Sequence, residues 1–81
     1  MTKKAKKGKE KIIVRDKDIL GGEPIIKGTR ITVDRILYLF KYGYNVKRLL
    51  REYPQLNEKQ IQACLDYAIE RLERLSKEEA G

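Results

Sequence analysis

Side chains that can read the edge of a DNA base gather near the start of the last predicted helix, which we place at about residues 58–76. Glutamine can bond adenine in bidentate fashion, lysine can reach guanine, and a small alanine allows close approach to a thymine methyl. Readout needs such residues at the start of a helix, on the face opposite its apolar stripe. The candidates there are Lys59, Gln60, Gln62, Ala63 and Tyr67. Any solvated helix face has a similar composition, so an ordinary exposed surface is an equally good interpretation.

The two preceding predicted helices carry positive side chains that suit phosphate contacts, since a helix that crosses the DNA backbone positions the reader. These candidates are Arg35, Lys47, Arg48 and Arg51, with Lys41 beside them. Acidic residues on the last helix oppose a purely electrostatic role, because they would repel phosphates if they faced the groove. They are Glu58, Asp66 and Glu70.

Most of the positive charge lies at the N-terminus. Residues 1–11 hold six lysines against one glutamate, a net of +5, whereas the whole chain has a net charge of +7. The lysines are Lys3, Lys4, Lys6, Lys7, Lys9 and Lys11. We expect a disordered arm that is attracted to phosphates without reading sequence. A solubilising tail is the alternative interpretation.

Catalysis and metal binding have little support in the composition. The chain has no His, and Cys64 is its single cysteine, so a zinc site lacks ligands and no internal disulfide is possible. Cys64 falls beside the apolar stripe of a helix, where it would be an inert small hydrophobe. We therefore expect a protein that is not an enzyme and has no cofactor or metal. The lone cysteine and the lack of a long apolar run predict a cytoplasmic protein that does not contact a membrane.

Two helices precede the last one, and polar residues mark their ends. Thr32 is a suitable N-cap for the first, and Gly43 is a suitable stop. The apolar residues of this helix recur at helical spacing: Val33, Ile36, Leu37 and Phe40. Asn45 is a suitable N-cap for the second, which cannot continue through Pro54.

The last helix has the strongest start signal. Asn57 is the predicted N-cap, and Gln60 stands at the position of a capping box. Leu56 is the predicted apolar plug of the turn before it. The stripe along this helix runs through Ile61, Leu65, Ala68, Ile69, Leu72 and Leu75. Three helices with a short turn between the last two make a helix-turn-helix arrangement.

Glycines and a proline divide the segment before the helices into short extended pieces. We expect strands at residues 12–14 and 24–26, and a third extended piece at residues 31–32. The turn residues are Gly22, Pro24, Gly28, Thr29 and Arg30. The guanidinium of Arg30 can bind a phosphate or a partner's carboxylate, or it can pin the turn to Glu23 or Asp34.

The order of residues 21–33, GGEPIIKGTRITV, resembles the opening signature of domain-of-unknown-function family 433. The resemblance continues in Tyr53-Pro54-x-Leu56 and in a helix that carries Ile61, Ala63 and Tyr67-Ala68. Members of this family look like antitoxins of toxin–antitoxin modules. The resemblance implies a homeodomain-type three-helix domain preceded by a β-hairpin, which binds DNA and a toxin.

We therefore predict a mainly α protein in three parts: a basic arm at 1–11, a β-hairpin and turn segment at 12–32, and a three-helix helix-turn-helix domain at 33–76. The predicted function is that of a non-catalytic, antitoxin-like regulator that binds operator DNA and a nuclease-like toxin. The toxin would contact the folded body or the amphipathic end around residues 69–75. The alternative is a dimeric protein-interaction module that does not bind nucleic acid.

A homodimer is expected because so short a chain buries a small core. The turn-rich segment would supply the interface through apolar residues that the body is too small to cover. These are Ile12, Val14, Ile25 and Ile31.

Overall fold

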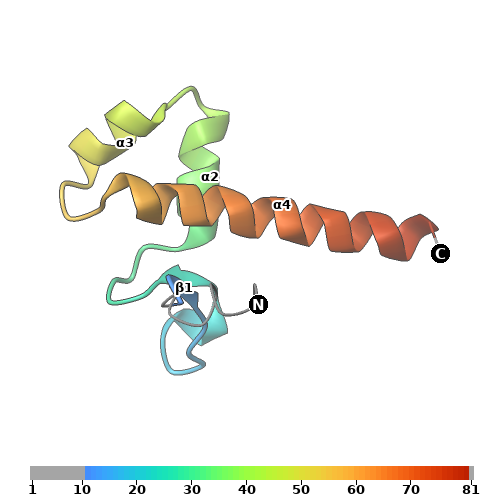
Figure 1. Cartoon of the computed structure of the whole chain (residues 1–81). Coiled ribbons are helices and arrows are strands. Elements are labelled where there is room, and N and C mark those ends of the chain that lie inside the picture. Colours follow the sequence, from blue (N-terminus) through green and yellow to red (C-terminus); the bar gives the residue numbers. More distant parts are fainter. Residues whose placement is uncertain (1–10, 81) are drawn as a thin grey trace, which may run out of the picture.

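The computed structural model describes the backbone of residues 11–80 and the side chains of residues 11–77. Its elements, in order, are β1 (Ile13–Val14), the 3₁₀ helix η1 (Leu20–Gly22), β2 (Ile25–Ile26), α2 (Val33–Lys41), α3 (Val46–Glu52) and α4 (Glu58–Ala80). Figure 1 shows α4 crossing α2 and extending well past it, with α3 above and the hairpin below. The predicted architecture, three helices preceded by a two-stranded hairpin, is confirmed. Of the predicted lysine arm, only Lys11 lies within the described residues, and it is exposed.

The first two helices begin and end where their polar residues predict. The hydroxyl of Thr32 accepts a hydrogen bond from the backbone N–H of Arg35 at 3.0 Å. The side chain of Asn45 accepts one from the N–H of Arg48 at 2.8 Å. Gly43 follows the last turn of α2 with φ +95°, a conformation that glycine adopts without steric cost. Local side-chain chemistry therefore sets these ends.

α4 begins as predicted but is longer than predicted. The backbone N–H of Asn57 donates to the side chain of Gln60 at 2.8 Å, and the N–H of Gln60 donates to the side chain of Asn57 at 2.9 Å. This reciprocal pair is a capping box. The helix continues to Ala80 rather than ending near Ser76. The predicted end was wrong because residues 77–80, Lys-Glu-Glu-Ala, are good helix formers.

The hairpin is short, and its second strand, β2, is buried. β1 and β2 pair antiparallel, with Ile13 opposite Ile26 and Val14 opposite Ile25. Ile25 also forms a bridge with Thr32, so the predicted third extended piece exists as a single bridge. Ile25 is only 2% exposed. The expectation that it lies on the surface was wrong, because extended backbone flanks it on both sides.

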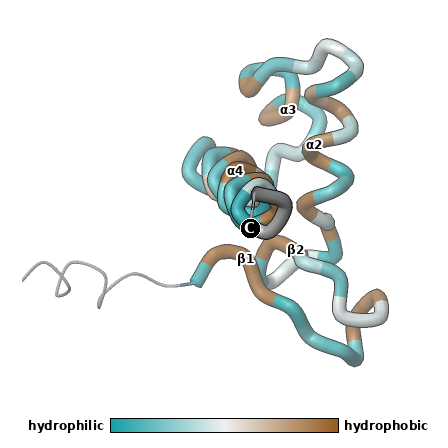
Figure 2. Tube along the Cα trace, turned by 90° about the vertical axis from the view of Figure 1, so that its right-hand side faces the viewer, coloured by the Kyte–Doolittle hydropathy of each residue, from teal (hydrophilic) through white to brown (hydrophobic). Residues whose placement is uncertain are grey.

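The core lies where the hairpin and the three helices meet. Its buried members are Ile26, Val33, Ile36, Leu49, Leu56, Ile61 and Cys64. Leu56, in the turn between α3 and α4, is 6% exposed and fills the position predicted for it. Figure 2, a view along α4, shows α2 and α3 on one side of this helix and the hairpin beneath it. The opposite side of α4 is left open at the surface.

Candidate nucleic-acid interface

The five residues predicted to read bases lie together on one surface. They line an open groove of about 770 Å³ that also includes Ile12, Ile13, Asn57, Asp66 and Glu70. The outer face of α4 forms one wall, and the start of β1 forms the rim. Sequence reasoning missed Ile12 and Ile13 as rim residues, because strand pairing and packing on α4 bring them there and no local pattern signals it.

The five candidates in the groove differ in their solvent exposure and in whether their side chains are already hydrogen-bonded. Lys59 and Gln62 are exposed, whereas Ala63 and Tyr67 are half-buried. The side-chain carbonyl of Gln60 already accepts the N–H of Asn57. A bidentate bond to adenine needs both ends of the amide, so Gln60 can read a base in that way only if the capping box opens. Lys59 and Gln62 are therefore the best-placed readers.

α3 presents a positive surface of its own. Lys47, Arg48 and Arg51 are all exposed. The guanidinium of Arg48 lies 3.9 Å from the ring centroid of Tyr44, a cation–π contact that favours one position of the side chain. The helix also carries one acid, Glu52, so its net charge is positive.

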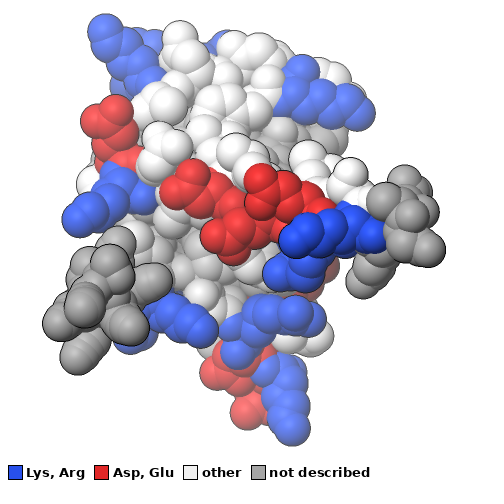
Figure 3. All heavy atoms as spheres, turned by 45° about the vertical axis from the view of Figure 1, so that its right-hand side comes forward, with Lys and Arg blue, Asp and Glu red and all other residues white. Residues whose placement is uncertain are grey.

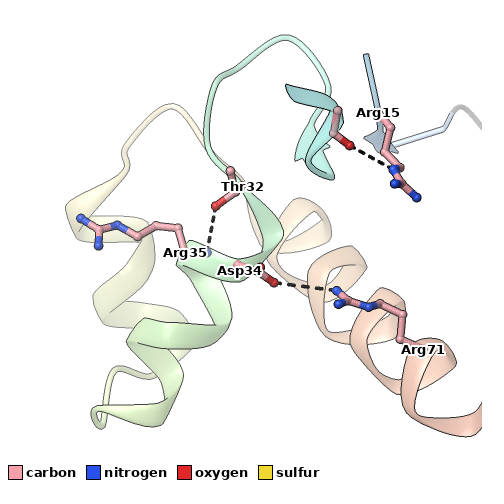
Figure 4. A network of polar contacts seen from close by, with 6 residues as sticks. Arg15, Thr32, Asp34, Arg35 and Arg71 are labelled. Carbon is pink, nitrogen blue, oxygen red and sulfur yellow. Dashed lines mark hydrogen bonds and ion pairs between the residues drawn. The ribbon is translucent and has the colours of Figure 1, made fainter. Parts of the chain in front are cut away.

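Arg35 is exposed on α2, away from the ion pair that links α2 to α4. Figure 4 shows its side chain extending to the side opposite Asp34 and Arg71. The carboxylate of Asp34 lies 3.8 Å from the guanidinium of Arg71. Both side chains are largely exposed, so this pair contributes little stability. Arg35 remains available for a phosphate.

Beyond the first turns of α4, one face of the helix carries acidic side chains, while Arg71, Arg74 and Lys77 lie on the same stretch. Asp66, Glu70 and Glu73 are all exposed. Figure 3 shows acidic side chains gathered over the middle of the molecule, where α4 runs, with basic side chains above and below. A phosphate backbone would be repelled along this acidic face. The candidate DNA-contacting side chains therefore lie on α3, at the start of α4 and, with Arg35, on α2.

The glycine-rich signature mainly builds the turn before α2. The hydroxyl of Thr29 donates to the carbonyl of Ile26 at 2.8 Å and accepts from the N–H of Ile31 at 2.9 Å. Gly28 has φ +82°, which a side chain would strain. The carbonyl of Pro24 accepts the N–H of Val33 at 3.0 Å, which ties the turn to the first residue of α2.

The remaining two signature residues, Gly22 and Arg30, differ in the contacts that they make. The carbonyl of Gly22 accepts a bond from the side chain of Arg15 at 3.0 Å (Figure 4). Arg30 is exposed, and within residues 11–77 no ion pair joins it to Glu23 or Asp34. The structure therefore does not form the predicted pinning of the turn by Arg30.

Cys64 is fully buried in the core. Desolvation raises the pKa of its thiol from 9.0 to about 11, so it is protonated at neutral pH and is a poor nucleophile. Within the described part of the chain, no three His, Cys, Asp or Glu side chains are grouped so that they could hold a metal ion. None of the described helices is long and apolar enough to cross a membrane.

Comparison with known proteins places this fold in a family. The family model described as "Protein of unknown function (DUF433)" matches residues 13–68. The uncharacterized protein y4eO of Sinorhizobium fredii is 35% identical over 57 residues, which are 70% of this chain and 26% of that protein. The crystal structure of a DUF433 member from Anabaena variabilis superposes with a TM-score of 0.75 at 25% identity, over 99% of this chain and 79% of the other. This chain spans about a quarter of the length of y4eO and most of the Anabaena protein. It belongs to the DUF433 family.

Proposed function

We propose that this protein is a non-catalytic, antitoxin-like regulator that binds operator DNA and neutralises a nuclease-like toxin by direct contact. The observation that carries the DNA-binding part is the run of exposed cations on α3, followed after a short turn by Lys59 and Gln62. In a helix-turn-helix protein the first helix crosses the phosphates and the start of the second reads the bases. α3 and α4 have the charges and the order that this division of labour requires.

The acidic face of α4 limits which part of the helix reads DNA. Lys59 and Gln62 lie in its first two turns, and Asp66 comes one turn after Gln62. A helix that enters the major groove with its N-terminal end keeps its later turns away from the phosphates. The acids at 66, 70 and 73 therefore suit a helix that enters end-on, and they oppose one that lies along the groove.

The same acids support contact with a toxin. Nucleases present positive surfaces to bind the phosphates of their substrate. The outer face of α4, with exposed Asp66, Glu70 and Glu73, has the charge to occupy such a surface. The resemblance to antitoxins suggests a nuclease-like toxin as the partner, and the acidic face of α4 is the surface that would contact it. A protein-interaction module with no affinity for nucleic acid is the alternative function.

The DNA-binding part is tested by neutralising α3. Replacing Lys47, Arg48 and Arg51 with Gln should weaken binding to duplex DNA and lower the log–log salt slope by about 2–3, since each phosphate contact contributes about 0.9. The control replaces two exposed cations of the turn segment that are not assigned to phosphate contact, Lys17 and Lys27, with Gln. Equal slopes for the two variants would show that α3 does not contact the backbone, and the interaction-module alternative would then be preferred.

The toxin part is tested with a candidate nuclease encoded beside this gene. The wild-type protein should inhibit the nuclease in a stoichiometric complex. Replacing Asp66 and Glu70 with Lys should abolish inhibition, whereas the α3 variant should inhibit normally. Inhibition that survives the charge reversal would place the toxin contact elsewhere on the molecule.

A further inference from the structure

The second half of α4 exposes a row of large apolar side chains. Ile69 is 52% exposed, Leu72 66% and Leu75 56%. They are three residues apart, so they lie along one side of the helix. Every residue from Ile69 to Lys77 is exposed. We call residues 69–77 the α4 extension.

This apolar row continues the stripe that the core buries. Ile61 and Leu72 are eleven residues apart, which is close to three helical turns, so both project to the same side of α4. Ile61 is fully buried, whereas Leu72 is largely exposed. The difference arises because the body ends near the ion pair between Asp34 and Arg71, and α4 continues beyond it (Figures 1 and 4). The α4 extension thus presents a core-type face with no cover from the described part of its own chain.

The α4 extension has a hollow that could receive a side chain from a second helix packed against it. A hollow of about 600 Å³ is lined by Ile69, Leu72, Glu73, Ser76 and Lys77. The first four of these stand at positions i, i+3, i+4 and i+7, the set that forms a hole in knobs-into-holes packing. The small side chain of Ser76 leaves the hole open, and Leu72 and Leu75 are knobs on the same helix.

We propose that the α4 extension is the homodimer interface, in which two copies pack antiparallel with Leu72 of one opposite Leu75 of the other. Knob and hole lie on the same nine residues, so the surface is self-complementary, as a two-fold interface requires. A parallel pair would force both bodies into the same space, because Leu72 projects to the same side of α4 as Ile61, which the body buries. An antiparallel pair sends the bodies to opposite ends.

The area that a stable dimer needs is a modest share of the surface. A standard interface takes about 800 Å² from each partner, which is about an eighth of the 6340 Å² surface of this chain. The proposal therefore replaces the turn-rich segment, whose Ile25 is buried, as the expected dimer surface.

The interface is tested by sedimentation equilibrium from about 1 to 100 μM. The wild type should reach twice the mass of the chain, and Leu72→Lys should raise the dissociation constant at least tenfold. The matched control is Leu20→Lys, which changes a leucine that is 47% exposed on η1. Circular dichroism checks that both variants fold. A wild type that stays monomeric, or a Leu72→Lys variant that dimerises as the control does, overturns the proposal.

The orientation is tested with a spin label on Glu58→Cys, since the native Cys64 is buried and resists labelling. The antiparallel pair places the two labels about 45 Å apart, whereas a parallel pair places them within about 15 Å. A short distance overturns the arrangement. DNA affinity, measured separately, distinguishes the two ideas: a monomer that binds DNA refutes the dimer alone, and a dimer with no affinity for DNA refutes the proposed function alone.

Discussion

Asn57 and Gln60 bond each other's backbone in both directions, at 2.8 and 2.9 Å. This pair fixes where α4 begins, and thereby where Lys59 and Gln62 point. It also occupies the side-chain oxygen of Gln60, one of the two glutamines predicted to read bases. One short segment thus contains both the structural start of the helix and its candidate readers.

The first prediction concerns this capping box. Asn57→Ala should lower the free energy of unfolding by about 1 kcal/mol, because the N–H of Gln60 loses the side-chain oxygen that caps it. Urea denaturation measures the loss. The control, Gln62→Ala, changes an exposed residue one turn later and should cost less than about 0.5 kcal/mol. Equal effects would mean that the box does not stabilise the helix.

The second prediction concerns the readers. Replacing Lys59 and Gln62 with Ala should leave the free energy of unfolding within about 0.5 kcal/mol, as expected of exposed positions. Specific DNA binding should weaken by about 1–3 kcal/mol for each base that the variant can no longer bond. Urea denaturation measures the first effect, and titration of operator and random duplexes measures the second. If folding suffers while affinity is unchanged, these residues have a structural role.

The third prediction concerns residues 1–11. Their deletion removes six lysines and one glutamate, and the fold should survive. Binding to any duplex should weaken, and the log–log salt slope should flatten by several units, since each neutralised phosphate contributes about 0.9. A control of full length with the lysines replaced by serine should behave like the deletion. An unchanged slope would identify the arm as a solubilising tail.

The fourth prediction concerns Thr29. Thr29→Val keeps the shape of the side chain but removes the hydroxyl that donates to Ile26 and accepts from Ile31. The loss should cost about 1–3 kcal/mol of unfolding free energy, because these backbone groups are partly buried. Thr29→Ser retains the hydroxyl and should be much closer to the wild type. If serine is as damaging as valine, the methyl group rather than the hydroxyl matters.

The fifth prediction is a pH dependence. Burial raises the pKa of the Cys64 thiol from 9.0 to about 11, so the folded protein holds this proton where the unfolded chain releases it. The resulting stability is complete below pH 9 and is lost as the pH rises from 9 to 11, by about 2–3 kcal/mol in total. Cys64→Ala should show a shallower fall over this range. Parallel curves would show that the thiol does not contribute.

The features that the sequence predicts correctly are mainly local. Thr32, Asn45 and Asn57 cap helices through residues three positions away, so the pattern carries the information. The burial of Ile25 depends on two segments that pair with it from either side. The ion pair of Asp34 with Arg71 and the Ile12–Ile13 rim likewise depend on how α4 crosses the other elements. Such contacts between distant segments leave no periodic signal in one sequence.

The position of Ile25 has a consequence for how this small protein can recognise a partner. Ile25 pairs with Val14 on one side and bridges Thr32 on the other, so β2 has no unpaired edge at this residue. In the described part of the chain, the outer edges that remain belong to β1, which is two residues long, and to the single bridging residue Thr32. An incoming strand would gain few main-chain hydrogen bonds there. Strand addition, and the edge-to-edge aggregation that accompanies it, is therefore disfavoured at this sheet.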